Sequence, residues 1–159
     1  MRKIAFVLLV LLVIAGCKSK KTGTASSPVK TPEPRVVKIS PDKVDDQQKQ
    51  KAYELGKRVL MTCNTSKFKP FNTNEATAEV IRNTTQERLT KTCHNFRLKY
   101  GEFRDIKFVE AVRDKSSKVN IYRFKAQYSK PIANKELRVS VNEENRVSAI
   151  KSLDWKDEF

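Results

Sequence analysis

The chain changes its hydrophobic period near residue 102. Between residues 40 and 101 apolar residues recur every three or four positions, whereas between residues 106 and 153 they alternate with polar ones. The first period is that of helices packed through one face, and the second is that of half-buried strands. Short turns join the alternating segments, so consecutive strands run antiparallel. The sequence therefore predicts an α+β domain in which N-terminal helices pack on an antiparallel sheet.

Three helices are predicted in the first half. The first begins at residues 40–41, with Ser as N-cap and Pro at the first position. A short helix follows over 75–82, and a third begins at 84–87, where the sequence Thr-Thr-Gln-Glu matches a capping box. Gly101 is placed to end the third helix with positive φ. The apolar faces comprise Ala52, Leu55, Val59, Leu60 and Cys63 of the first helix and Leu89, Cys93, Phe96 and Tyr100 of the third.

Four strands are predicted in the second half. They cover residues 106–110, 119–128, 137–141 and a last segment that begins at Val147 and extends towards Trp155. Turn-forming sequences at 114–117 and 142–145 separate them.

The N-terminus carries an export signal. Met1-Arg2-Lys3 precedes an apolar run over residues 4–14, too short for a membrane-spanning helix, and Ala15-Gly16-Cys17 follows. Residues 14–17 resemble the lipobox of bacterial lipoproteins. The resemblance implies cleavage after residue 16 and attachment of several acyl chains, such as palmitate, to Cys17, a stable membrane anchor. Without Asp after Cys17, it implies the outer membrane of a bacterial cell envelope, with the periplasmic or surface face left open. An ordinary secretory signal is the alternative.

Residues 17–39 are predicted to form a disordered basic tether behind this signal. Ser, Thr, Lys and Pro dominate the segment, and it has no apolar period. The expected organisation is a signal peptide at 1–16, the lipidated cysteine and tether at 17–39, and a globular domain at 40–159. The net charge of +15 suggests an anionic neighbour such as lipid headgroups, but the charge is diffuse rather than clustered, which favours a solvated basic surface. An exported, anchored protein is not expected to meet nucleic acid.

Cys63 and Cys93 remain as an even pair once Cys17 is assigned to the anchor. Export places them in an oxidising compartment, and they lie on the apolar faces of two helices expected to pack together. The pattern favours a Cys63–Cys93 disulfide. Two buried free thiols are the alternative, because sequence does not give geometry.

Three segments resemble domains of the nuclear transport factor two-like or cystatin-like class. They are Tyr100-Gly101-Glu102-Phe103, the strand at 122–126 and the strand at 147–150. The resemblance covers about residues 42–156 and implies a curved sheet wrapped around helices, often with an apolar cavity. It implies no single activity, because this fold carries enzymes, ligand carriers and binding modules.

Few residues suggest catalysis or ion binding. His94 is the single histidine and the candidate general base of a hydrolase or isomerase. One histidine with two separated cysteines lacks the spacing of a metal site, and no cofactor motif is present. A basic patch is a further candidate if strands align its four members, although a solvated outer sheet face, with long side chains covering the strands, is the favoured explanation. These members are Arg123, Lys125, Arg138 and Arg146.

The sequence thus favours a non-enzymatic, membrane-anchored envelope protein that binds a partner protein or a small apolar ligand. The alternatives are catalysis through His94 and recognition of an anionic envelope polymer. A cavity between sheet and helices, lined by apolar side chains without converging ionisable groups, would favour the first.

Overall fold

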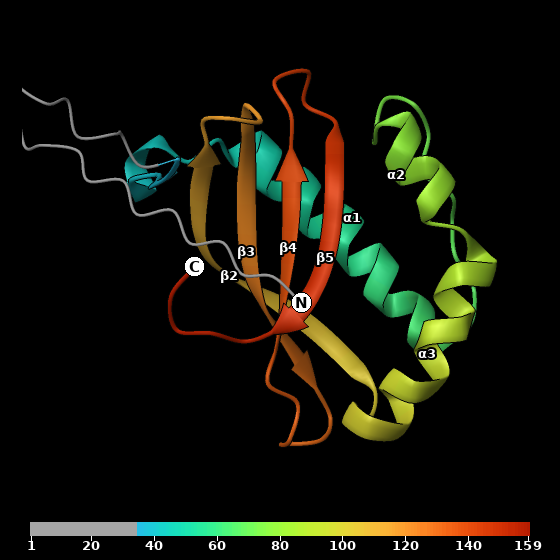
Figure 1. Cartoon of the computed structure of the whole chain (residues 1–159). Coiled ribbons are helices and arrows are strands. Elements are labelled where there is room, and N and C mark those ends of the chain that lie inside the picture. The colour runs from blue at the N-terminus through green and yellow to red at the C-terminus, as the bar shows by residue number, and fades with distance from the viewer. Residues whose placement is uncertain (1–34) are drawn as a thin grey trace, which may run out of the picture. The chain divides into compact units, whose positions relative to one another are not determined.

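The computed structural model describes residues 35–159, which form three α-helices and an open five-stranded sheet (Figure 1). The strands are antiparallel, and their order in the sheet is their order in the chain. The elements are β1 Val36–Lys38, α1 Asp46–Thr65, α2 Ala78–Asn83, α3 Gln86–Tyr100, β2 Phe103–Asp114, β3 Val119–Tyr128, β4 Lys135–Val141 and β5 Val147–Asp154. The predicted α+β class with N-terminal helices and an antiparallel sheet is confirmed.

The predicted strand count of four is wrong. The fifth strand, β1, lies at residues 36–38 of the segment expected to be a disordered tether, and it pairs with the far end of β2. Val36 and Val37 face Asp114 and Arg113 in this ladder. Three residues are too few to show alternation, so the sequence pattern alone did not reveal the strand. The rest of the predicted tether, the signal segment and Cys17 lie outside the described residues.

The first helix begins later than predicted. Residues 41–43 form a separate 3₁₀ turn after Ser40, and the true N-cap of α1 is Asp45, whose carboxylate accepts a hydrogen bond from the Gln48 N–H at 3.0 Å. Likewise α2 begins at Ala78 rather than residue 75, because Thr77 is its cap. The cap of α3 is Thr85, which accepts from the Arg88 N–H, so Glu87 is not positioned for the expected reciprocal capping box.

Helix α1 lies across one face of the sheet and forms the core with it. Apolar residues of β2, β3 and β4 meet Ala52 and Leu55 of α1, and all are almost fully buried. Gly56 permits this close approach: a Cβ there would lie 2.6 Å from Leu137 Cδ2. Gly101 ends α3 with a φ of 80°, which confirms the predicted stop.

Within residues 35–159 no helix is both long enough and apolar enough to cross a membrane.

A short segment before α2 pairs with the start of β5. The Val147 N–H donates to Glu75 O and the Thr77 N–H donates to Val147 O, both at 2.9 Å. The Glu75 side chain fixes this segment, because its two oxygens accept from the Arg58 guanidinium at 2.8 and 3.1 Å. The hydrogen bond from Arg58 is the main reason that the pKa of Glu75 lies below its usual 4.5.

This lowered pKa predicts a pH-dependent effect of Glu75→Gln. A depressed carboxyl pKa contributes stability that is present above the unfolded value near 4.5 and is lost as the pH falls through the lower folded value. The variant is therefore expected to be less stable than the wild type near pH 7, and the difference should shrink as the pH falls below 4.5 and through the lower folded-state pKa. Urea unfolding at several pH values measures it. Glu87→Gln, in an exposed pair with Lys91, is the control and should change little. A Glu75→Gln deficit that is equally large in acid would contradict the assignment.

Candidate functional site

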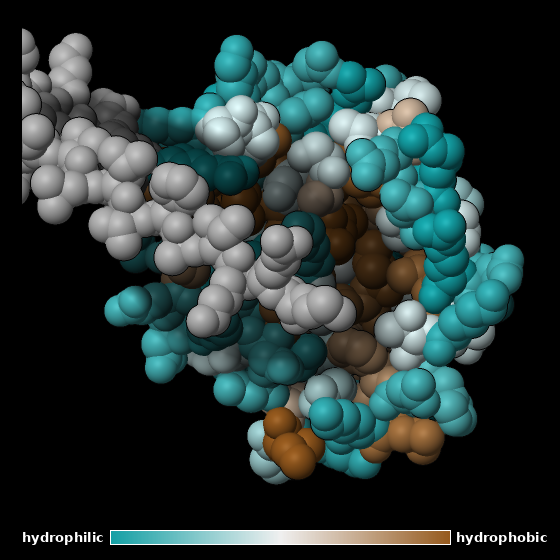
Figure 2. All heavy atoms as spheres, in the orientation of Figure 1, coloured by the Kyte–Doolittle hydropathy of each residue, from teal (hydrophilic) through white to brown (hydrophobic). Residues whose placement is uncertain are grey.

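An apolar pocket of about 230 Å³ lies between helices α1 and α3 and the β5 edge of the sheet. Figure 2 shows apolar residues gathered in a hollow between the sheet and the helices. The pocket is open to solvent on one side, and all four neighbouring elements contribute to its wall. Its lining residues are Val59, Leu60 and Cys63 of α1, Leu89, Thr92, Cys93 and Phe96 of α3, Leu137 of β4, and Ile150 and Ser152 of β5.

The chemistry of this lining is that of a binding site for an apolar group. No lining residue is ionisable, apart from the two cysteines that are joined in a disulfide. The Thr92 hydroxyl donates to the Arg88 carbonyl of its own helix, so it offers little to an acyl or phosphoryl group. The pocket can therefore desolvate an aliphatic or aromatic group, and its wall supplies no general acid or base.

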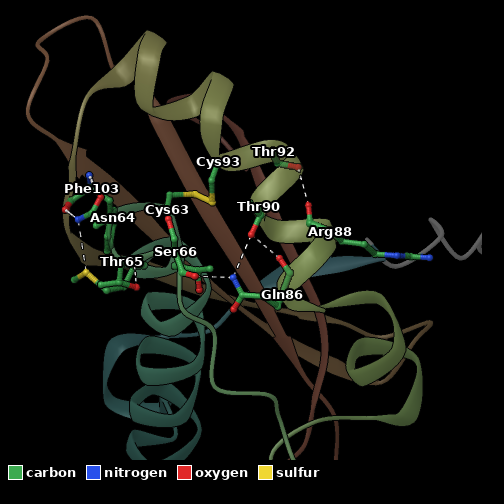
Figure 3. Close-up of a disulfide and its surroundings, with 12 residues drawn as sticks. Cys63, Asn64, Thr65, Ser66, Gln86, Arg88, Thr90, Thr92, Cys93 and Phe103 are labelled. Atoms are coloured by element: carbon green, nitrogen blue, oxygen red, sulfur yellow. Dashed lines mark hydrogen bonds between the residues drawn. A yellow bond between two sulfur atoms is a disulfide. The ribbon is translucent and has the colours of Figure 1, made fainter.

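The disulfide between Cys63 and Cys93 forms part of the pocket wall (Figure 3). The two Cα atoms lie 4.7 Å apart, within the range that a disulfide needs, and the favoured prediction of a Cys63–Cys93 bond is confirmed. The bond joins the last turn of α1 to the middle of α3, which holds α3 at a fixed position above α1. The space between the two helices is therefore held in place by a covalent bond.

Gln86 reinforces the same junction at the start of α3 (Figure 3). Its side-chain amide donates to Ser66 O at 2.8 Å, and its carbonyl accepts from the Phe68 N–H at 2.5 Å. Asn64 forms a second clamp, since its amide both donates to Phe103 O and accepts from the Phe103 N–H. These contacts tie the end of α1 to α3 and to β2, so the pocket is pre-formed.

The predicted basic patch is dominated by a buried ion network on the sheet face away from α1. Arg123 of β3 lies directly opposite Arg138 of β4 on one side and Glu110 of β2 on the other. Glu136 of β4 lies on the same face of the sheet. Arg123 Nε donates to Glu136 at 2.5 Å, Arg123 Nη1 to Glu110 at 2.9 Å, and Arg138 Nε to Glu136 at 2.6 Å. Arg123 and Glu136 are both fully buried. Hydrogen bonds from Lys38 and then Arg123 keep the pKa of Glu110 below its usual range.

Residues 155–159, the C-terminal tail, cover this network. Arg123 donates to the Lys156 carbonyl, and its guanidinium lies 4.3 Å from the Trp155 ring. Lys125 lies 4.1 Å from the same ring, and burial lowers its pKa. Arg138 packs on the Phe159 ring at 4.1 Å.

Arg146 lies apart from the other three, in the turn between β4 and β5, where it pairs with Glu144. The four cations therefore do not form one exposed surface for an anionic polymer.

His94 lies on the exposed side of α3, away from the apolar pocket. It lines a separate hollow with Arg97, Leu98 and Lys130, none of which is an acid that could orient an imidazole base. Among residues 35–159 no three His, Cys, Asp or Glu side chains are grouped to hold a metal ion.

The sequence identified only part of the pocket. The helical stripes predicted burial of Leu60, Leu89 and Phe96, and the resemblance implied a cavity, but no pattern marked Ile150 or Ser152 as its β5 wall. Alternation from Val147 would place Ala149 on the helix side, whereas a register shift between Ser140 and Val141 brings Ile150 there instead. A bulge of this kind leaves no reliable signal in a polar turn.

No family model matches the chain, and neither the curated proteins nor the solved structures include a match.

Proposed function

We propose that this chain is a membrane-anchored envelope lipoprotein that binds an apolar group of a partner protein or small ligand without catalysing a reaction. In this proposal a lipid on Cys17 holds it in the bacterial envelope, at the outer membrane. The basic start, short apolar run and Ala-Gly-Cys ending support the anchor. The order of helices before hairpin-linked strands supports a cystatin-like or nuclear transport factor two-like domain.

The observation that carries the binding role is the composition of the pocket. An open cavity of about 230 Å³ keeps aliphatic and aromatic surface in contact with water, and an occupant would remove that surface from water. Its walls hold no charged group that would repel an apolar occupant. Its size suits one ring system, a short branched chain or one large side chain of a partner.

A neutral fluorescent probe tests this role. N-phenyl-1-naphthylamine is expected to bind the mature chain at a single site, with one of its two ring systems in the pocket, and to fluoresce more when bound. Thr92→Phe places an aromatic ring at the pocket mouth and is expected to weaken binding by about tenfold, a difference of about 1.4 kcal/mol. Thr92→Val is the matched control, because it removes the hydroxyl without adding comparable volume, and it should bind like the wild type.

Thermal unfolding of each variant shows whether the domain stays folded. Equal probe affinity in the wild type and a folded Thr92→Phe variant would exclude this pocket as the binding site. Loss of binding in both variants would show that the hydroxyl, rather than the apolar volume, is what the probe requires, which also contradicts the proposal.

A further inference from the structure

We propose that the groove between β5 and helices α2 and α3 binds an extended acidic segment of a partner protein by strand addition, with one apolar side chain of that segment in the pocket. This inference rests on the proposed function and names its partner. The groove consists of the apolar pocket and a second hollow of about 270 Å³ that shares Ile150 with it. The second hollow is lined by Glu79, Val80, Asn83, Thr84, Ser148, Ala149, Ile150 and Lys151.

The backbone of β5 is available along this groove. The Trp155 N–H donates to Asn134 O, which fixes the phase of the ladder between β4 and β5. Because bonding alternates along an antiparallel pair, the backbone groups of Ile150 and Ser152 point away from β4. Within the described part of the chain, these outward groups have no hydrogen bond to another element. Their side chains face the pocket, so one bound segment would meet both backbone and apolar contacts.

The chain itself already adds a strand-like segment to this edge. Residues 75–77 pair with Val147 in a parallel bridge and then leave the edge where α2 begins at Ala78. An incoming segment would continue along the same edge beyond this bridge. Main-chain hydrogen bonds would supply affinity, and the pocket would select an apolar side chain at one position.

Charge around the groove favours an acidic segment. Lys151 of β5 lines the second hollow, and Arg88 of α3 donates to Asn83 of the same lining at 2.9 Å. Neither cation forms an ion pair within residues 35–159, and the net charge of the chain is +15. Glu79 lines the same hollow, so an acidic residue of the bound segment would lie on the Lys151 and Arg88 side of it. Acidic residues beside the apolar anchor would therefore gain favourable interactions that other segments lack.

Two other occupants are less well matched. The chain's own residues 18–30 are rich in lysine and would be repelled by the same cations. Antiparallel pairing of two β5 edges would bring the two copies of Lys151 into one short stretch, where like charges destabilise a sheet. An acidic partner segment avoids both penalties.

Selection from a displayed library of random dodecapeptides tests the proposal. The target is the chain from residue 17 onward with Cys17→Ser, so that no lipid competes for the pocket. Selected peptides are expected to share an apolar residue with acids nearby, and a synthetic consensus peptide should protect the Ile150 and Ser152 amides from hydrogen exchange. Its affinity should fall with added salt.

The matched variants are Ser152→Pro and Ser152→Ala. Edge strands tolerate proline. The substitution removes an outward N–H that the fold does not use, and it places the proline ring where the peptide would bind. Ser152→Pro should weaken the consensus peptide by about tenfold or more, whereas Ser152→Ala should not. Equal binding to a folded Ser152→Pro variant, or no enriched peptide, would overturn strand addition. Concentration-dependent dimers lost in Ser152→Pro would overturn it in favour of a second copy. If the naphthylamine probe still binds while peptides do not, the inference fails and the proposed function stands.

Discussion

Replacing Arg123 with Ala is expected to lower the free energy of unfolding by about 3–5 kcal/mol, the range for breaking a buried ion pair from one side. The substitution would leave the Glu136 carboxylate, which is fully buried, with Arg138 as its remaining charged partner. It would also remove the guanidinium on which Trp155 packs and the donor to the Lys156 carbonyl, so the C-terminal tail should loosen. Urea unfolding followed by circular dichroism measures the change.

Two comparisons isolate the cause of that loss. Arg97→Ala removes an exposed arginine paired with Glu102 at 3.2 Å and is expected to cost less than about 1 kcal/mol. The double variant Arg123→Met, Glu136→Leu removes both buried charges together and is expected to recover part of the loss, because the buried carboxylate that lost its contact with Arg123 is gone as well. A single Arg123→Ala variant as stable as the Arg97→Ala variant would show that the network is not buried in solution.

Removing the disulfide is expected to cost a similar amount, about 3.5 kcal/mol, from the entropy of closing a 30-residue loop in the unfolded chain. The double variant Cys63→Ala, Cys93→Ala should show this loss in chemical unfolding. Because the bond also holds α3 above α1, probe binding in the pocket should weaken as well. Reductant present during unfolding should destabilise the wild type by the same amount and leave the double variant unchanged.

A wild type that unfolds identically with and without reductant would contradict the presence of the bond. A double variant that loses stability but keeps full probe affinity would show that Gln86 and the helix contacts suffice to hold α3 in place. The stability effect and the pocket effect are therefore measured separately.

Sequence periodicity predicted the helices and the main strands because burial dictates their patterns. Ala52 and Leu55 fall at helical spacing, and Tyr122 and Phe124 are separated by a charged residue, which leaves one packed arrangement for each segment. Sequence periodicity failed where a few residues or a single hydrogen bond determine whether an element forms or where it begins. The Asp45 cap moved the start of α1, and β1 forms only because β2 offers an edge to residues 36–38.

The candidate basic patch shows why a site needs more than a pattern. Alternation correctly placed Arg123, Lys125 and Arg138 on one face of the sheet. Glu110 and Glu136 alternate in the same way, yet their pairing with Arg123 depends on strand register and on a bulge between Phe108 and Glu110. Register is a relation between strands, so no single strand's sequence states it.

By itself, the sequence determined the α+β class, the order of helices before strands, and the pairing of Cys63 with Cys93 as its favoured outcome. These follow from local periodicity and from a count of cysteines. Only the tertiary structure decided that α3 stands off from β5 and leaves an apolar pocket, that the tail covers Arg123, and that no other strand among residues 35–159 pairs with the β5 edge beyond Val147. Each of these depends on contacts between segments far apart in the chain, whose free energies a local pattern does not contain.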